Sequence, residues 1–193
     1  MTHPNSSSAI DFSDRVRLFA DRIAESSAAA LSGLYDLTAQ RLVRYAATIT
    51  RNQHDAEDAV QTALVKVAGQ PQLLCRSARP WSYLLRMVRN ESLLILRRKQ
   101  RWSLVSNVTD LLARRRVDEL DQEEMHRAVW SALRTLPTEQ SEVVVLKIWE
   151  EMTFIQIAEI LEISPSTAAS RYRYAIGKLT QKLDVGDREA CYE

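Results

Sequence analysis

Apolar side chains recur at every third or fourth position along most of the chain, which is the spacing of one helix face rather than of a strand. The one strand-like run, Val143-Val-Val-Leu146, is short and fits a buried helix equally well. The stripes predict helices near residues 31–49, 56–67, 80–96, 122–135, 137–149, 153–161 and 165–183, with one more inside residues 11–30. We therefore predict an all-α protein.

Polar stretches divide these helices into two groups. Gly69-Gln-Pro71 interrupts the first group, and Pro80 opens its last helix. Residues 102–121 have mixed character, with Arg114-Arg-Arg116 running into acids, and predict a flexible linker. We expect two small helical domains, the second containing a helix-turn-helix. The predicted divisions are an N-terminal extension at 1–30 with room for one helix, domains at 31–101 and 122–185, the linker at 102–121 and a tail at 186–193.

The helix-turn-helix is predicted from capping residues in the segment 153–174. Thr153 and Gln156 have the spacing of a capping box, and Ser164 followed by Pro165 is typical of a helix start. The second helix would place polar side chains on its outer face near its N-terminal end, where a recognition helix meets base edges and phosphates. These residues are Ser166, Thr167, Ser170, Arg171, Arg173 and Tyr174. From these residues alone, an ordinary helical hairpin with a solvated basic face is the alternative.

The charge of the chain is unevenly distributed, although its net value is only +1. Residues 80–101 carry six Lys or Arg against one Glu, and residues 164–183 carry four Lys or Arg and no acid. Residues 117–126 carry five acids and no Lys or Arg. Two basic segments separated by an acidic one favour two phosphate contacts, although runs of charge are also common on solvated helix faces.

Several classes of protein are disfavoured by the composition. No apolar stretch approaches the roughly 20 residues of a membrane-spanning helix, so we expect no membrane insertion. The N-terminus lacks the pattern of a secretion signal, and Cys75 and Cys191 have no metal or redox spacing, which fits a reducing cytoplasm. A Gly-rich phosphate loop, a nucleophile constellation and a metal-ligand cluster are all missing from the sequence. We expect no catalysis, no metal and no cofactor.

Four stretches in order resemble the sigma-70 family of RNA polymerase sigma factors, in its small extracytoplasmic-function (ECF) class. They are Asp55-Ala-Glu-Asp-Ala-Val-Gln61, Leu84-Leu-Arg-Met-Val-Arg-Asn90 with Leu96-Arg-Arg-Lys-Gln-Arg101, Leu136-Pro-Thr-Glu-Gln-Ser-Glu-Val143, and Ile157-Ala-Glu-Ile-Leu-Glu-Ile-Ser164 with Ser170-Arg171. Each motif is weak alone, but together they cover most of residues 31–101 and 123–183. The resemblance implies a promoter-specificity subunit that binds core RNA polymerase, recognises two promoter elements and helps to melt DNA.

The resemblance assigns the acidic helix start to polymerase docking. Its side chains Asp55, Glu57, Asp58 and Gln61 would face the clamp helices of core polymerase, where acids can pair with basic residues and steer the encounter. Acids near a helix N-terminus are also favoured by the helix dipole, and the two explanations are compatible.

The helix that Pro80 opens is implied to melt and read the downstream, or −10, element. Separated strands need aromatic surfaces for unstacked bases and cations along the phosphates. The candidates are Trp81, Tyr83, Arg86, Arg89, Asn90, Arg97, Arg98 and Lys99. Trp81 also lies on the apolar stripe, so a core position is its alternative. Residues 69–79 correspond to a family segment that captures a flipped base, but they diverge here and receive no specific assignment.

The recognition helix is implied to read the upstream, or −35, element. Ser170, Arg171, Arg173 and Tyr174 fall on contact positions of the family. Ala169 departs from the Lys or Arg of many members, which removes one base or phosphate contact. Glu162 departs from the usual Gly of the turn, so either Glu162 adopts a left-handed conformation at a cost of roughly 1 kcal/mol or the turn is built differently.

The implied partners are core RNA polymerase, promoter DNA and an anti-sigma protein. The linker would thread through polymerase toward the RNA exit path, with a plain tether as the alternative. The competing function is a conventional dimeric helix-turn-helix regulator that binds a palindromic site without polymerase. That alternative gives no role to residues 55–61 or to the helix at 80–101.

Overall fold

The computed structural model describes residues 11–24, 28–105 and 124–190, and all regular structure within these ranges is helical. The predicted all-α class with two helical domains is confirmed, whereas the predicted linker lies largely outside the described residues. The helices are α1 (Phe12–Ala24), α2 (Ala28–Thr50), α3 (Gln53–Gly69), α4 (Gln72–Cys75), α5 (Pro80–Val105), α6 (Glu124–Thr135), α7 (Thr138–Ile148), α8 (Phe154–Leu161) and α9 (Pro165–Ala190).

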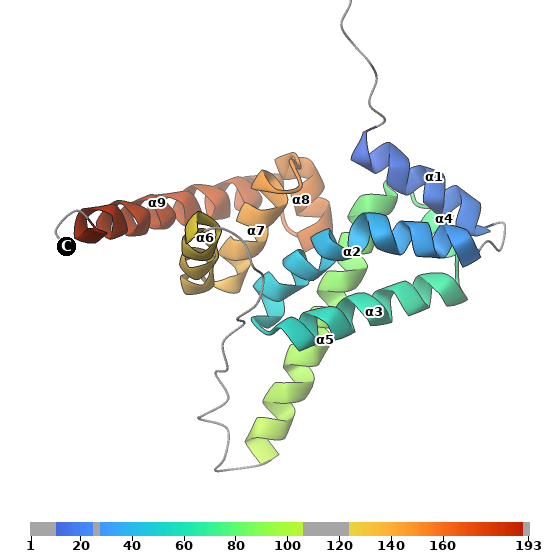
Figure 1. Cartoon of the computed structure of the whole chain (residues 1–193), viewed down its shortest axis with the longest axis horizontal. Coiled ribbons are helices and arrows are strands. Elements are labelled where there is room, and N and C mark those ends of the chain that lie inside the picture. The colour runs from blue at the N-terminus through green and yellow to red at the C-terminus, as the bar shows by residue number, and fades with distance from the viewer. Residues whose placement is uncertain (1–10, 25–27, 106–123, 191–193) are drawn as a thin grey trace, which may run out of the picture.

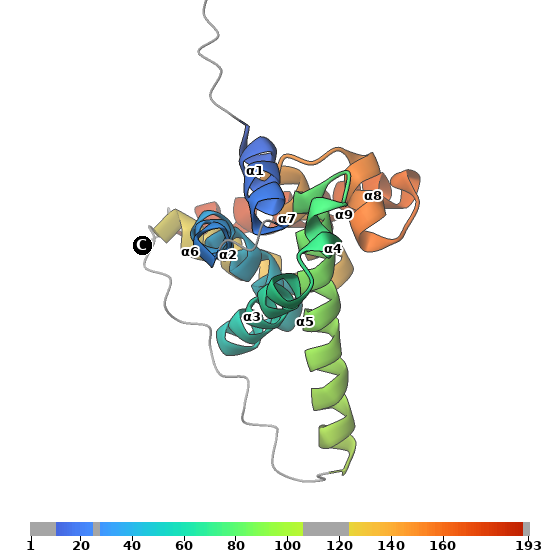
Figure 2. The same cartoon turned by 90° about the vertical axis from the view of Figure 1, so that its right-hand side faces the viewer.

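Helices α2, α3 and α5 form the centre of the first domain (Figure 1). Leu34, Leu42 and Ile49 of α2 are almost fully buried, as are Leu84 and Leu85 of α5. Full burial of one such side chain contributes about 1.5–3 kcal/mol, so this apolar stripe is what holds the helices together. The C-terminal part of α5 extends beyond the other helices in both views (Figures 1 and 2).

Local sequence signals set the ends of α3. Asn52 caps its N-terminus, since the Asn52 side chain accepts a hydrogen bond of 3.1 Å from the backbone N–H of Asp55. Gly69 is its last residue, and Pro71 is the N-cap residue of the short helix α4. The predicted break at Gly69-Gln-Pro71 is therefore present, but the sequence did not predict α4.

Helix α1 lies within the predicted extension and packs against α2, α4 and α5. Val16, Ala20 and Ile23 are buried in the same core as α2. A Cβ atom on Gly33 would lie 2.4 Å from the Phe19 ring, so the close approach of α1 to α2 requires glycine there.

The second domain consists of α6 to α9, with α7 and α8 packed against α9. The Thr153 and Gln156 side chains form the predicted capping box at the start of α8. Glu162 ends α8 in the left-handed conformation at φ 57° and ψ 46°. The sequence left two possibilities for this turn, a left-handed Glu162 or a different turn. The structure has the left-handed Glu162, in the conformation that glycine favours.

The two domains pack directly against each other. Helix α7 lies against α2, and α8 lies beside the N-terminal part of α5. One set of buried apolar side chains runs through both domains. Within the described ranges, no helix is long and apolar enough to cross a membrane.

Candidate nucleic-acid and polymerase interface

The four predicted polymerase-docking residues of α3 do not share one environment. Glu57, Asp58 and Gln61 are exposed on the outer face of the helix. Asp55 is only 8% exposed, and its carboxylate lies 2.6 Å from the ammonium group of Lys99 on α5. The exposed three can meet a partner, whereas Asp55 joins α3 to α5.

The outer face of α5 carries most of the predicted downstream-element residues. Asn90, Arg97 and Arg98 are exposed, and Lys99 is exposed apart from its contact with Asp55. The Arg86 guanidinium lies 5.3 Å from the centre of the Tyr83 ring, and both side chains are half-buried. A cation beside an aromatic ring is a surface on which an unstacked base can sit.

Trp81 lies in the core. It is 4% exposed, and the Phe12 ring of α1 packs edge-on against it with ring centres 4.9 Å apart. Arg41 in turn lies over the Phe12 ring at 3.8 Å. The structure therefore shows the core position that was the alternative for Trp81, and in this arrangement its indole is closed to a base.

Arg89 is bound by the second domain. Its Nε atom donates a 2.7 Å hydrogen bond to Oε1 of Glu142 on α7, and the Tyr45 hydroxyl of α2 donates to the same oxygen at 3.1 Å. Burial raises the pKa of Glu142 despite the opposing charge of Arg89. Burial also raises the pKa of Tyr45 well above its usual value, so the phenol stays protonated.

Glu150, in the loop between α7 and α8, makes a second contact between the domains. Its side chain is fully buried and lies 2.9 Å from an Arg44 nitrogen and 3.6 Å from an Arg41 nitrogen. Burial raises the pKa of Glu150, and the two arginines oppose that rise.

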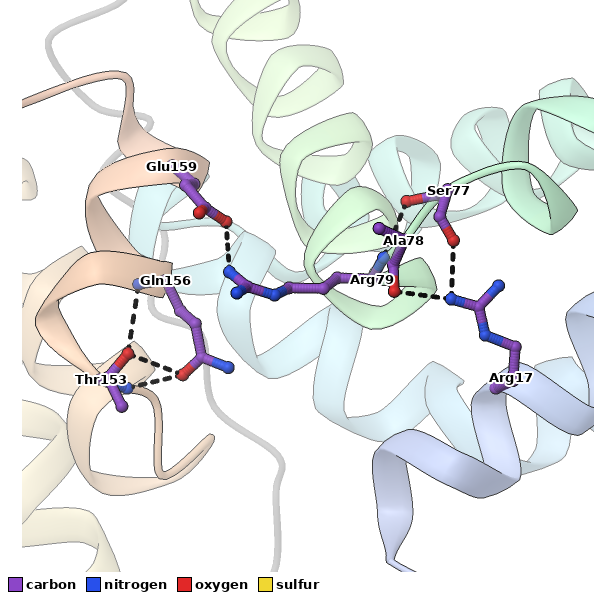
Figure 3. A network of polar contacts seen from close by, with 7 residues as sticks. All are labelled: Arg17, Ser77, Ala78, Arg79, Thr153, Gln156 and Glu159. Atoms are coloured by element: carbon purple, nitrogen blue, oxygen red, sulfur yellow. Dashed lines mark hydrogen bonds and ion pairs between the residues drawn. The ribbon is translucent and has the colours of Figure 1, made fainter.

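Arg79, in the loop before α5, makes the third contact. Its guanidinium lies 2.6 Å from the Glu159 carboxylate of α8, and both side chains are about half exposed (Figure 3). Arg17 of α1 holds the same loop from the other side by donating to the carbonyl oxygens of Cys75, Ser77 and Ala78. The loop is therefore held between α1 and the second domain.

The recognition helix α9 has a free outer face. The Ser164 side chain accepts a 3.0 Å hydrogen bond from the Thr167 backbone N–H, as expected of a helix cap. Ala168 and Ala175 are buried on the inner face. Of the predicted upstream-element residues, Ser170 and Arg171 are half-buried, whereas the exposed ones are Ser166, Thr167, Arg173 and Tyr174.

The residues that join the domains were not among the predicted site residues, apart from Arg89. Glu142, Glu150 and Glu159 each pair with an arginine more than 50 positions away, and such a distance leaves no periodic signal. The one available hint was a carboxylate at position 142, directly before the apolar run Val143-Val-Val-Leu146.

Two helical domains with basic helix faces, one of them ending in a helix-turn-helix, define a two-domain DNA-binding protein. Residues 34–102 match the family model for sigma-70 region 2, and residues 126–179 match that for sigma-70 region 4. The ECF RNA polymerase sigma factor SigL of Mycobacterium tuberculosis is 30% identical over 163 residues, covering 83% of this chain and 92% of that protein. The RNA polymerase sigma-E factor of Streptomyces avermitilis is 29% identical over 153 residues, covering 77% of this chain and 82% of that protein.

Two solved structures share the fold. The sigma factor RpoE of Bartonella quintana, in complex with the anti-sigma factor NepR, has a TM-score of 0.63 at 22% identity and covers 80% of this chain and 96% of that chain. CnrH, in complex with the cytosolic domain of CnrY, has a TM-score of 0.63 at 21% identity and covers 89% and 99%. The chain belongs to the sigma-70 family, in its ECF class. It is an RNA polymerase sigma subunit, as the sequence predicted.

Proposed function

We propose that three exposed helix faces of this sigma factor bind different partners. Glu57, Asp58 and Gln61 of α3 dock on core RNA polymerase. The outer faces of α5 and α9 contact the downstream and upstream promoter elements. The observation that carries the proposal is the separation of charge: the docking face is acidic, whereas the two DNA faces are basic or rich in hydrogen-bond donors.

The downstream face suits separated strands. Tyr83 beside Arg86 offers a stacking surface, and Asn90, Arg97 and Arg98 supply polar and cationic contacts along the same helix. Arg89 belongs to this group once it is released from Glu142. Trp81 supports this face indirectly, by packing beneath the start of α5. It would become accessible to a base only if α1 moved away from it.

The upstream face suits a duplex. Arg171, Arg173 and the hydroxyl side chains near the start of α9 lie where a recognition helix meets bases and phosphates in the major groove. Because Ala169 supplies no cation, specificity for the upstream element rests on fewer contacts than in relatives with Lys or Arg there.

The proposed partners are core polymerase, promoter DNA and an anti-sigma protein in the cytoplasm, with no chemistry performed by the chain itself. The sigma factor RpoE of Bartonella quintana is bound by the anti-sigma factor NepR in its solved structure, which supports a protein inhibitor here. The descriptions of the curated relatives as polymerase sigma factors support the first two partners.

The test is transcription with purified components. The protein is mixed with core RNA polymerase and fragmented genomic DNA of its host, and the 5′ ends of the transcripts are sequenced. Discrete starts that share two upstream elements, and that vanish without the protein, are expected. A dimer that binds a palindromic duplex and creates no new starts would instead establish the conventional regulator.

A further inference from the structure

Arg17 connects helix α1 to the loop that precedes α5. Its guanidinium donates hydrogen bonds of 3.3, 2.7 and 2.6 Å to the backbone carbonyl oxygens of Cys75, Ser77 and Ala78, and Figure 3 shows the last two. The Arg17 side chain is half-buried, and its neighbour Val16 is fully buried in the core, so the packing of α1 fixes where the guanidinium lies. The conformation of the loop therefore depends on a residue 58 to 61 positions earlier in the chain.

This loop, residues 75–79, continues the downstream face of α5. Arg79 directly precedes the helix, and its carbonyl oxygen accepts a 3.0 Å hydrogen bond from the backbone N–H of Tyr83. Positions 79, 83 and 86 are spaced four and three residues apart, which places them on one side of a helix. The loop therefore lies at the end of the face on which Tyr83 and Arg86 form the proposed stacking surface.

Arg17 leaves this loop with more open hydrogen-bond donors than acceptors. Of the five carbonyl oxygens in residues 75–79, Arg17 occupies three and the Tyr83 N–H occupies a fourth. The backbone N–H of the exposed Ala78, in contrast, donates no hydrogen bond to any described residue. The Arg76 side chain is exposed and makes no ion pair within the described ranges. Donors and cations of this kind suit phosphate oxygens, which only accept hydrogen bonds.

We propose that Arg17 is a positioning residue for binding of the downstream element. By holding the loop in one conformation, Arg17 allows the Ala78 N–H and the Arg76 guanidinium to contact a phosphate of the separated strand, next to the base that stacks at Tyr83. Arg17 itself does not touch the DNA. The inference rests on the proposed function for the stacking surface, and it adds α1 and the loop, to which that proposal gives no role.

The shape of the Arg17 side chain matters as well as its charge. A guanidinium donates from a planar, rigid fork, whereas the ammonium group of lysine is a point donor on a flexible stem. Arg17→Lys therefore keeps the charge but does not hold all three carbonyl oxygens in their present positions. A loop that samples several conformations binds more weakly, because only the competent fraction can meet the strand.

The test uses the full-length chain assembled with core RNA polymerase, and a fluorescent single strand that carries the downstream element of a mapped promoter. Arg17→Lys should weaken binding of this strand about fivefold in anisotropy measurements, because fewer loops are in the binding conformation. Arg15→Lys is the matched control, since Arg15 is an exposed arginine on the same helix, and it should bind like wild type. Binding of core polymerase and of the upstream duplex should not change in either variant, which excludes misfolding. Wild-type binding of the strand by Arg17→Lys would overturn the proposal.

Neutral linkages distinguish a positioning role from a general loss of stability. Each phosphate of the strand is replaced in turn by a methylphosphonate, which removes its charge. For the wild type, one replacement next to the base that stacks at Tyr83 should weaken binding. For Arg17→Lys, the same replacement should have little further effect, because the contact is already lost and the two changes are not additive. If every replacement weakens wild type and Arg17→Lys equally, no phosphate contact depends on Arg17 and the proposal is wrong.

Tyr83→Ala separates this inference from the proposed function. If Tyr83→Ala leaves binding of the strand unchanged, the downstream face of the proposed function is wrong, and the role of Arg17 beside that face is wrong with it. If Tyr83→Ala weakens binding but Arg17→Lys does not, the downstream face is correct and only the role of Arg17 is wrong.

Discussion

Glu162 carries the conformational cost of the helix-turn-helix, because its backbone has φ 57° in a position where the family usually has glycine. A residue with a side chain loses free energy in this region, whereas glycine does not. We expect Glu162→Gly to stabilise the folded protein by about 0.5–1 kcal/mol, since part of the relief is offset by the added freedom of the unfolded chain. Urea unfolding followed by circular dichroism measures the change.

The control for this substitution is Glu162→Ala. Alanine removes the same carboxylate, which lies near enough to Arg89 to raise the pKa of that guanidinium, but keeps the Cβ atom. It should therefore give no stabilisation. Equal gains from Gly and Ala would show that the charge and not the backbone conformation is responsible.

Single substitutions at Asp58 and Arg171 test the proposed polymerase-docking face and the proposed upstream DNA face separately. Asp58→Arg reverses a charge on the exposed docking face and should weaken binding to core polymerase by roughly tenfold, because like charges then meet across the interface. Binding of the upstream duplex should not change. Pull-down with core polymerase and anisotropy with a promoter duplex measure the two effects in parallel.

Arg171→Ala should give the opposite result. Loss of a base or phosphate contact costs about 1–3 kcal/mol of duplex binding, while polymerase binding stays at the wild-type level. If Asp58→Arg left polymerase binding unchanged, the docking assignment on α3 would be wrong. If both variants lost both activities, the two faces would not be independent.

The residue environments that local pattern could predict are those set by neighbours on the same helix. The caps at Thr153 and Ser164 were predicted in this way. Asp55 and Arg89 were predicted as exposed partners of other molecules, but each is paired with a residue more than 40 positions away. Since these contacts arise only when distant helices meet, helical periodicity does not contain them.

Helix α1 acts as an element that fixes the loop before α5. Arg17 donates three hydrogen bonds to carbonyl oxygens of Cys75, Ser77 and Ala78, at 3.3, 2.7 and 2.6 Å. Hydrogen bonds from a charged donor contribute about 1.5–3 kcal/mol, so Arg17→Ala should raise the rate of amide exchange in residues 73–80 by roughly tenfold or more. Hydrogen–deuterium exchange with mass spectrometry measures it.

Arg15→Ala is the matched control on the same helix, since Arg15 is exposed and carries the same charge. It should leave exchange in residues 73–80 unchanged. Equal exchange in the two variants would mean that the loop is held by the packing of Phe12 against Trp81 and not by Arg17.

The elements themselves were largely predictable, because each long helix buries one continuous apolar stripe. The helix from Pro80 and the helices at 153–161 and 165–183 lie close to α5, α8 and α9. Helix α4 has four residues, too few for a helical repeat to register. The packing of α7 on α2 was not predictable either, since it depends on carboxylates whose partners lie in another domain.

At the scale of the whole molecule, the two buried glutamates make the packing of the two domains sensitive to pH. Burial raises the pKa of Glu142, although Arg89 and Tyr45 lower it, and the nearby Glu139 adds to the rise. Burial also raises the pKa of Glu150, although Arg44 and Arg41 lower it. A carboxyl whose pKa is higher when the domains are packed together binds protons more readily in that state. Packing of the two domains is therefore favoured as the pH falls from neutrality through the raised pKa values, and the advantage is complete only below the usual value of 4.5.

This pH dependence is opposite to that of an exposed ion pair, because acidification would protonate the carboxylate of such a pair and break it. Glu159→Arg is the sample of choice, because it replaces an ion pair across the domain contact with two like charges and leaves the core unchanged. We expect its radius of gyration by small-angle scattering to be smaller at pH 5.5 than at pH 7.5. The same variant with Glu142→Gln and Glu150→Gln should lose this dependence, because neither position can then take up a proton. Expansion on acidification would mean that Coulomb attraction to the arginines outweighs the cost of burial, and that the charged glutamates hold the domains together.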